Sequence, residues 1–339
     1  MSFGGLAALP RARLATLPTP LEEAPGLSAA LGGPRILVKR EDLTGFALGG
    51  SKVRKLEMIL GDALAQQADT LVVSGDLQSN LSRLVAAAAA SLGLRAVLVL
   101  GGEADESRKA QGNLLLDALA GAEIRYFTGD FREGHERSLA VAEELRRAGR
   151  VPYVVPLGGS GPLGASGYLE AARELREQLA VAGVEAASLI VPVGSCGTMA
   201  GLLLGVKVLA LRLRVVGMSV SRPEPYVRER VAALVSETAA LLGIGVEVPA
   251  DEVIVHDEWI GPGFGILGDE ARDALRFAAA RGGLYLDPVY NAKAFAGLRA
   301  LVRRGSLGPR DTVVFVHTGG VPALFAYAEE LAGAPAGGS

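Results

Sequence analysis

The segment Gly49-Gly50-Ser51-Lys52-Val53-Arg54-Lys55-Leu56-Glu57 joins a turn to the start of a helix. The two glycines permit a tight backbone turn. The residues after them repeat with helical spacing, which gives an apolar face formed by Leu56, Ile59, Leu60 and Leu64. Lys52 therefore stands at a helix N-terminus, where the positive end of the helix dipole favours a neutral amine. A neutral amine is the form that Schiff-base chemistry requires, although most lysines in such isolated loops are ordinary surface residues.

Outside this segment, short apolar runs alternate with amphipathic stretches. The apolar runs predict buried parallel strands at 70–74, 96–100, 153–156, 188–193, 214–219 and 312–317. The amphipathic stretches predict helices at 82–92, 111–119, 138–148, 165–182, 198–211, 228–242, 269–280 and 291–303. Because strands and helices alternate, we expect an α/β protein with mainly parallel, twisted sheets, whose ligands bind beyond the carboxyl ends of the strands.

The composition restricts the classes of function. The 339 residues carry a net charge of −3, which gives no electrostatic case for binding nucleic acid or an anionic membrane. The single cysteine, Cys196, excludes an intrachain disulfide, and His135, His256 and His317 are too widely spaced to suggest a metal site. The N-terminal segment lacks the apolar core of a signal peptide, and no apolar run reaches the roughly 20 residues of a membrane span. We therefore expect a cytoplasmic protein.

Seven further segments carry polar or glycine-rich motifs in a fixed order. They are Pro18-Thr19-Pro20-Leu21, Lys39-Arg40-Glu41-Asp42-Leu43-Thr44-Gly45, Gln78-Ser79-Asn80, Gly158-Gly159-Ser160 with Pro162-Leu163-Gly164, Gly194-Ser195-Cys196-Gly197-Thr198, Asp287-Pro288-Val289-Tyr290, and His317-Thr318-Gly319-Gly320 with Pro322-Ala323-Leu324-Phe325. Together with the lysine segment they resemble the D-cysteine desulfhydrase and aminocyclopropane-carboxylate deaminase family, from about residue 16 to about residue 328. The lysine segment departs at one position, because the family usually has Asn where this chain has Ser51.

The resemblance implies a pyridoxal 5'-phosphate enzyme of fold type II, similar to the β subunit of tryptophan synthase. It implies a smaller α/β domain at 56–168, inserted into a larger cofactor-binding domain formed by 1–55 and 169–339. The cofactor would lie in the cleft between the two domains. Family members are usually homodimers, so the resemblance also implies a homodimer.

The resemblance further assigns cofactor-binding residues. Lys52 would hold the cofactor, Lys55 would help to neutralise its phosphate, and Asn80 would support its ring, with Asn291 and Thr318 near the pyridine nitrogen. The phosphate cradle is expected between a strand and a helix, where consecutive N–H groups bind phosphate well: Gly194, Ser195, Cys196, Gly197 and Thr198. The Cys196 thiol beside a helix N-terminus is a candidate for a lowered pKa, but we favour a small residue that fills the loop.

Substrate binding is expected at a second strand-to-helix junction. Gln78, Ser79 and Asn80 offer N–H groups and side chains that suit a substrate carboxylate, although Ser and Asn are also preferred at a helix N-cap. The resemblance gives Ser79 a part in proton transfer or attack, and gives Tyr290 a phenol that faces the substrate. A phenol near a cationic lysine can have a lowered pKa, so we expect Tyr290 to move a proton.

Four residues of the expected site depart from the family pattern. Leu81 replaces His or Gln and Phe264 replaces Tyr, so the substrate pocket becomes less polar. Asp76 occupies a position where the family usually has glycine, and the sequence offers no explanation for it. Asn291 stands where the deaminases have Glu and the desulfhydrases have Thr, so no carboxylate is expected at the pyridine nitrogen. A weaker electron sink suits β-elimination better than the opening of a cyclopropane ring.

These observations favour a pyridoxal-phosphate lyase that removes a β substituent from a small amino acid such as D-cysteine. The products would be a 2-oxo acid, ammonia and the leaving group. The expected catalytic residues are Lys52, Ser79 and Tyr290, and the expected substrate contacts are Gln78, Ser79, Asn80, Leu81 and Phe264, without a metal ion. Aminocyclopropane-carboxylate deamination, β-replacement and racemisation stay open as alternative activities. An inactive homologue that binds an amino acid or the cofactor also stays open, although the joint presence of the three catalytic residues argues against it.

Overall fold

The computed structural model describes residues 3–102 and 110–332, and its strands form two sheets. The strands of the smaller sheet are β3 (Thr70–Asp76), β4 (Arg95–Gly101), β5 (Glu123–Phe127) and β6 (Pro152–Val155). They lie in the order β5-β4-β3-β6, and every pair is parallel. The helices that accompany this sheet are α2 (Lys52–Ala65), α3 (Asn80–Leu92), α4 (Gly112–Leu119) and α5 (Phe131–Arg147).

Alternation along the strands gives the smaller sheet two apolar faces. One set of side chains packs beneath α5 and includes Val72, Val97 and Val99. The opposite set packs against α2 and α3 and includes Leu71, Val73, Leu98 and Leu100. Burial on both faces explains why these strands read as continuous apolar runs in the sequence.

The larger sheet has the order β1-β2-β10-β7-β8-β9, and only the short edge strand β1 is antiparallel. Its strands are β1 (Leu21–Glu23), β2 (Arg35–Lys39), β7 (Ser188–Val193), β8 (Arg214–Ser219), β9 (Ile254–His256) and β10 (Thr312–Val316). One face is covered by α6 (Pro162–Ala182), α7 (Gly197–Val208) and α8 (Glu224–Leu242). The other face is covered by α1 (Pro25–Leu31), α9 (Asp269–Gly282) and α10 (Asn291–Arg303).

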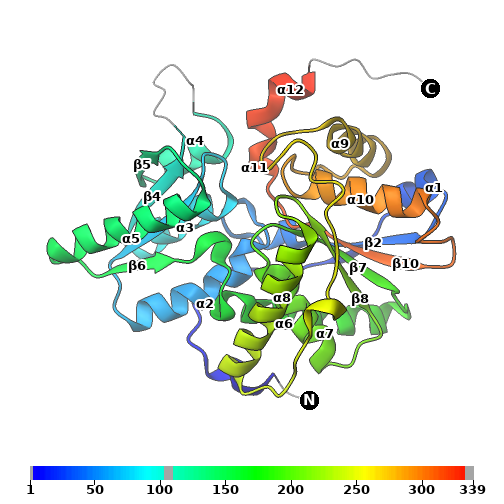
Figure 1. Cartoon of the computed structure of the whole chain (residues 1–339), viewed down its shortest axis with the longest axis horizontal. Helices are drawn as coiled ribbons and strands as arrows, with labels where there is room; N and C mark the ends of the chain where they lie inside the picture. Colours follow the sequence, from blue (N-terminus) through cyan, green and yellow to red (C-terminus); the bar gives the residue numbers. More distant parts are fainter. Residues whose placement is uncertain (1–2, 103–109, 333–339) are drawn as a thin grey trace.

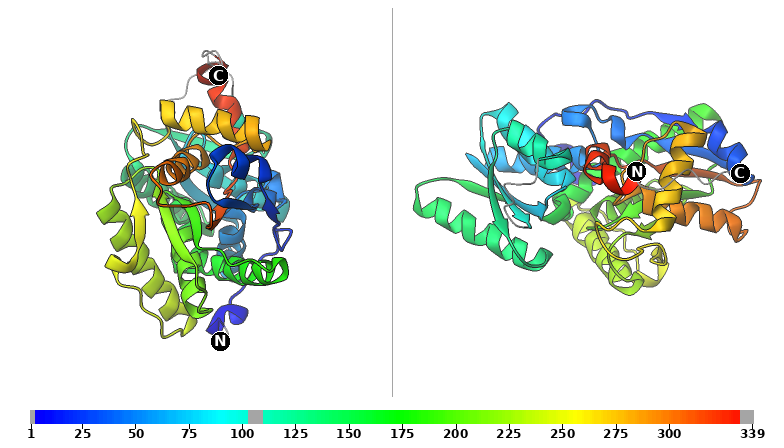
Figure 2. Two further views of the ribbon diagram at one scale, coloured as in Figure 1. Left: turned by 90° about the vertical axis from the view of Figure 1, so that its right-hand side faces the viewer. Right: turned by 90° about the horizontal axis from the view of Figure 1, so that it is seen from above.

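The two sheets lie side by side along the longest dimension of the molecule. Figure 1 shows the smaller sheet on the left and the larger sheet on the right, and the right-hand view of Figure 2 shows the same division from above. Helix α2 packs against α6, so it connects the two halves at their junction. Short helices complete the chain: α11 (Val321–Leu324), α12 (Ala328–Ala332), η1 (Gly4–Ala8), η2 (Glu41–Leu43), η3 (Phe46–Leu48), η4 (Leu157–Gly159), η5 (Ala250–Glu252) and η6 (Phe325–Tyr327).

The expected α/β class with mainly parallel sheets is confirmed. All six expected strands are present, and so are all eight expected helices, several of which start earlier than the sequence indicated. Strands β1, β2, β5 and β9 were not expected; β1 and β9 have only three residues each. Within the described ranges, the structure contains no helix with both the length and the apolar character needed to cross a membrane. The division at 56–168 stays a prediction.

Candidate active site

The segment before Lys52 has an unusual backbone. Ala47, Leu48, Gly49 and Gly50 all have positive φ angles, of 43°, 66°, 65° and 117°. Glycine adopts such angles without strain, but the two residues with side chains do so against a steric penalty. The turn places Lys52 at the first position of α2, the helix position that the sequence indicated.

Hydrogen bonds from both halves of the molecule hold this turn. Arg83 on α3 is buried and donates to the carbonyl oxygens of Ala47 and Gly49, the second at 3.1 Å. The N–H of Ser51 donates to the carbonyl oxygen of Thr318 at 2.9 Å, which ties the turn to the end of β10. Strained backbone persists only where its surroundings over-determine it, and these contacts supply that constraint.

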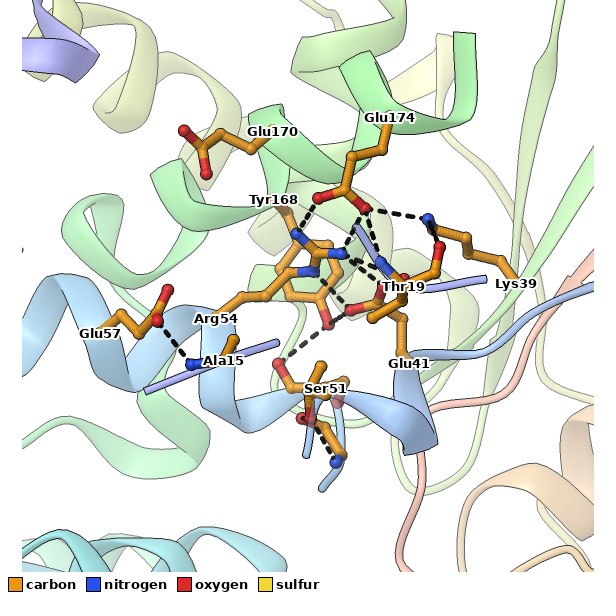
Figure 3. Close-up of polar contacts among 12 residues, drawn as sticks. Ala15, Thr19, Lys39, Glu41, Ser51, Arg54, Glu57, Tyr168, Glu170 and Glu174 are labelled. Carbon is orange, nitrogen blue, oxygen red and sulfur yellow. Dashed lines mark hydrogen bonds and ion pairs between the residues drawn. The ribbon is translucent and has the colours of Figure 1, made fainter. Parts of the chain in front are cut away.

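A buried ion-pair network supports the same segment (Figure 3). Arg54 on α2 is fully buried and donates to both carboxylate oxygens of Glu41, at 2.7 and 2.9 Å, and to both of Glu174 on α6, at 2.9 and 2.7 Å. Burial alone would raise the pKa of each carboxyl, but Arg54 outweighs it and holds both pKa values below their ordinary range. The Tyr168 hydroxyl oxygen lies 2.9 Å from the Ser51 carbonyl oxygen, so the network extends to the residue before the lysine.

Lys52 itself lies in the wall of a cavity between the two halves of the molecule. Burial lowers its pKa to about 8, although the charge of Asp287 and a hydrogen bond with Lys55 act in the opposite direction. Its Nζ lies 5.8 Å from the centroid of the Tyr290 ring. A pKa near 8 keeps a usable fraction of the amine neutral near neutral pH, which is the state that a nucleophilic lysine needs.

This lowered pKa predicts a pH profile for acylation of the apoprotein. Only the neutral amine reacts with acetic anhydride, so the labelling rate of Lys52 should rise with pH, with a midpoint around pH 8, and level off above it. Quantitative peptide mass spectrometry over pH 6–11 measures this profile, with the exposed Lys207 as an internal reference for reagent reactivity. A midpoint near 10.5, the ordinary value for lysine, would show that Lys52 is a solvated surface residue.

The turn after β7 forms a narrow cradle. Cys196 has a left-handed backbone, with φ of 69°, and α7 begins at the next residue, Gly197. The Ser160 hydroxyl donates to Ser195 Oγ at 2.8 Å and accepts hydrogen bonds from the Gly197 N–H and from Lys55 Nζ, both at 3.1 Å. A Cβ at Gly197 would lie 2.6 Å from Ser160 Oγ, so this close approach requires glycine.

Two lysines bring positive charge to this cradle without an anionic partner. Lys55 is fully buried, and its Nζ donates to the Gly158 carbonyl oxygen at 3.3 Å and to Ser160 Oγ. Within residues 3–102 and 110–332, neither Lys52 nor Lys55 forms an ion pair with a carboxylate. Burial and the neighbouring Lys52 hold the pKa of Lys55 well below its usual value, and a bound anion would reverse that shift. Two amines beside a helix N-terminus therefore fit the phosphate of pyridoxal phosphate.

A cavity of about 280 Å³ adjoins the cradle on the substrate side. Its wall includes Ser79, Leu81 and Phe264 together with Lys52 and Tyr290. Ser79 is also the N-cap of α3, because its Oγ accepts a hydrogen bond from the N–H of the third residue beyond it at 3.1 Å. The two expected uses of this serine, helix capping and lining the site, are therefore compatible.

An aromatic row closes one side of this cavity. The Phe264 ring packs edge-on against Tyr290, with centroids 5.8 Å apart, and against Phe131, at 5.1 Å. Phe131 starts α5 beside the smaller sheet, whereas Phe264 and Tyr290 belong to the chain around the larger sheet. Nothing in the sequence around Phe131 pointed to the site, because only the approach of the two halves brings it there.

The expected direction of the Tyr290 pKa is wrong. Burial raises the pKa of this phenol well above its ordinary value, and the negative charges of Asp76 and Asp287 raise it further. The cationic lysine that was expected to lower it does not contribute to the shift. Tyr290 thus keeps its proton, and any proton transfer by this residue starts from the phenol as donor.

Three expected site residues, Gln78, Asn291 and Gly197, use their polar groups in hydrogen bonds within the protein. The Gln78 side chain accepts a hydrogen bond from the Asn113 N–H at 2.9 Å and donates to the Gln111 carbonyl oxygen at 3.1 Å, so it holds α4. The Asn291 Oδ1 accepts a hydrogen bond from the Thr318 N–H at 2.9 Å, so Thr318 lines the site and Asn291 lies behind it. Likewise, the Gly197 N–H is already donated to Ser160.

The remaining expected cofactor residues line a second pocket, at the cradle: Lys52, Lys55, Asn80, Gly194, Ser195, Cys196, Thr198 and Thr318. Burial raises the pKa of Cys196 to about 11, against the fall that a helix N-terminus alone would cause, so this thiol is unreactive at neutral pH. Asn80 is oriented by Asn113, whose Nδ2 donates to Asn80 Oδ1 at 2.9 Å. Sequence reasoning missed Asn113 because its position depends on the packing of α4 against α3.

Comparison with known proteins agrees with this geometry. Residues 12–319 match the model of a family described as pyridoxal-phosphate dependent enzymes. A putative 1-aminocyclopropane-1-carboxylate deaminase of Pyrococcus abyssi is 42% identical over 327 residues, which cover 96% of each chain. A D-cysteine desulfhydrase of Klebsiella pneumoniae strain 342 is 39% identical over 334 residues, covering 98% of this chain and 100% of the relative.

A solved structure of an aminocyclopropane-carboxylate deaminase homologue has the same fold. It is 40% identical to this chain, with a TM-score of 0.89, and the match covers 96% of this chain and 97% of the other. The expected fold type II arrangement and the expected cofactor are thereby confirmed. Because the family model spans most of its length and its relatives match it from end to end, this chain belongs to the pyridoxal-phosphate dependent enzymes.

Proposed function

We propose that this enzyme removes a β substituent from a small amino acid, in the manner of a D-cysteine desulfhydrase. The observation that carries the proposal is the position of Lys52, a lysine with a pKa of about 8 that separates the phosphate cradle from a cavity large enough for a small amino acid. The full-length similarity to relatives named D-cysteine desulfhydrase supports the same activity.

Each residue near the cavity has a role in this proposal. Lys52 holds the cofactor and, once displaced by the substrate amine, takes the proton from Cα. Ser79 and Asn80 bind the substrate carboxylate at the N-terminus of α3, where N–H groups face the cavity. Tyr290 keeps its proton by burial and donates it toward the leaving group. When bound, pyridoxal phosphate supplies the electron sink for the bond-breaking at Cα.

The surroundings of Thr318 favour β-elimination over the opening of a cyclopropane ring. The residue of this region that lines the cofactor site is Thr318, and the group directly behind it is the Asn291 amide. The nearest carboxylate in the loop, Asp287, is occupied by the N–H groups of Val289, Tyr290 and Asn291. Neutral groups hold a proton on a pyridine nitrogen weakly, so the sink is weaker than the ring-opening reaction requires.

The test is a set of product assays on the purified yellow holoenzyme. With D-cysteine and water we expect pyruvate, sulfide and ammonia in equal amounts, and with 1-aminocyclopropane-1-carboxylate we expect little 2-oxobutanoate. Rapid release of 2-oxobutanoate without sulfide production would support the deaminase, which the similarity to relatives of that name favours. Binding without any product would support β-replacement, racemisation or an inactive homologue.

The proposal extends to the location, the oligomeric state and the domain division of the protein. We propose a cytoplasmic homodimer, in which 56–168 forms a smaller domain and 1–55 with 169–339 forms the cofactor-binding domain. The division has support in the strand order, because β3 to β6 build one sheet and the strands before and after them build the other. Sedimentation analysis of the holoenzyme measures the oligomeric state, and a monomer at micromolar concentration would contradict the homodimer.

A further inference from the structure

Asp76 places a carboxylate in the wall of the substrate cavity. It is the last residue of β3, and it lines the cavity together with Lys52, Ser79 and Tyr290. Its Oδ1 accepts one hydrogen bond, from the Gln78 N–H at 2.8 Å. Across the described ranges, no Lys, Arg or His side chain forms an ion pair with it. A partly buried carboxylate in a cavity wall that lacks a cationic partner is available to pair with a cationic group of a ligand.

The cations that face the same cavity are committed elsewhere. Arg230 on α8 pairs with Glu237 at 2.9 Å, and the Arg222 guanidinium stacks 5.6 Å from the Tyr226 ring centroid. Lys52 is the cofactor lysine. Burial raises the pKa of Asp76, and backbone hydrogen bonds in the turn offset part of this rise. No positive charge contributes to lowering the pKa. Asp76 is therefore a carboxyl group in the cavity wall with no directly paired cation.

We propose that Asp76 binds a protonated amine on the substrate side chain, so that small diamino acids are better substrates than neutral amino acids. This inference rests on the proposed β-elimination. A carboxylate in the pocket repels an anionic side chain and gains nothing from an apolar one, whereas it forms a charge-assisted hydrogen bond with an ammonium group. The apolar neighbours Leu81 and Phe264 strengthen that bond by excluding water from the cavity.

The chemistry of the leaving group fits this assignment. In 2,3-diaminopropionate, the electron pair of the broken Cα–H bond forms the Cα–Cβ double bond, and the Cβ–N bond breaks with its pair on nitrogen. A β-ammonium group then leaves as neutral ammonia with its three hydrogens, whereas an unprotonated amine would have to leave as an amide ion. Asp76 favours the protonated form. With one water, the products are pyruvate and two ammonia molecules.

Asp76 also has a structural role that the test must separate. Its Oδ1 orders the turn from β3 to α3, since it accepts the Gln78 N–H. Asp76→Asn keeps that acceptor and removes the charge, whereas Asp76→Ala removes both. The asparagine variant is therefore the decisive one, and the alanine variant reports the additional contribution of the turn.

The experiment measures kcat/KM of the holoenzyme for 2,3-diaminopropionate and for β-chloroalanine, each as both enantiomers. The second substrate has an uncharged β substituent of similar size, which leaves as chloride. We expect Asp76→Asn to lower the ratio of kcat/KM for the diamino acid to that for the chloro compound on the order of 10- to 100-fold. In the Lys52→Ala background, calorimetry should show a similar loss of affinity for the diamino acid, with little change for serine.

The outcomes separate this inference from the proposed function. A wild-type enzyme that eliminates chloride from neither enantiomer of β-chloroalanine contradicts the proposed function. An enzyme that does so, but whose substrate ratio is the same in wild type and Asp76→Asn, contradicts the inference alone. A ratio that falls in Asp76→Ala but not in Asp76→Asn assigns Asp76 to the turn and also overturns the inference.

Discussion

Replacing Lys52 with alanine is expected to lower kcat on the order of 10³-fold or more, because the group that we propose to take the Cα proton is lost. The yellow absorbance of the purified protein should disappear as well, since among residues 3–102 and 110–332 the buried Lys55 is the one other lysine that adjoins the cradle. Visible spectra and product assays of the variant, with and without added pyridoxal phosphate, measure both effects.

Lys207→Ala is the matched control for this variant. Its amine is exposed on α7 and pairs with Glu252, outside the cavity, so the spectrum and turnover should match those of the wild type. Colour and turnover retained in Lys52→Ala would refute the assignment of this lysine. Loss of colour together with a lowered melting temperature would be resolved by Lys52→Arg, which keeps the positive charge.

Replacing Arg54 with methionine is expected to lower the free energy of unfolding by about 3–5 kcal/mol, because two buried carboxylates lose their cation. Glu41 is completely buried, and Glu174 keeps only Lys39, at 3.0 Å. The effect should also reach the active site, since the network contacts Ser51 through Tyr168. Denaturant unfolding followed by circular dichroism gives the stability, and KM for the substrate reports the site.

The stability difference between wild type and Arg54→Met should depend on pH in a definite direction. Both glutamates have a pKa below the ordinary value of 4.5 in the wild type, so their stabilisation is present above that pH and is lost as the pH falls through the folded values. In Arg54→Met the carboxyls prefer the protonated form, and acidification toward pH 5 should recover stability relative to wild type. Arg95→Met, which breaks an exposed pair with Glu123, should change stability by less than about 1 kcal/mol. Equal losses in the two variants would contradict the importance of the buried network.

Elements with strong local signals were predicted well from the sequence. Strands β7 and β8 and helix α10 have the expected bounds. Strand β2 was missed because Arg35 and Lys39 flank its three apolar residues, and the Lys39 ammonium is buried through contacts with the Thr19 carbonyl oxygen and with Glu174 and Gln178 on α6. The early start of α5 at Phe131 had a local signal, since Asp130 and Glu133 form a capping box.

The features of the candidate site likewise fall into those with a local sequence signal and those without one. The position of Lys52 and the turn at 194–198 followed from glycine and helix patterns that span a few residues. Other features of the site depend on residues distant in sequence. They are the raised pKa of Tyr290, the hydrogen bond of Gln78 to Gln111 and the packing of Phe131 on Phe264. The sequence showed that Asp76 departs from the family pattern, but its role could be proposed only once the structure placed it in the wall of the cavity.

The strand order of the larger sheet has a consequence for biosynthesis. Strand β10 lies between β2 and β7, so the middle of this sheet stays open until the chain has been made through Val316. The smaller sheet, whose strands end at Val155, can form while the ribosome is still translating the rest. Until β10 has been synthesised, β2 and β7 expose the strand edges that β10 will cover. During this time the nascent chain is prone to aggregation through those edges. The Thr318 carbonyl oxygen that accepts the Ser51 N–H lies just after β10, so the turn before Lys52 is completed only when synthesis is nearly finished.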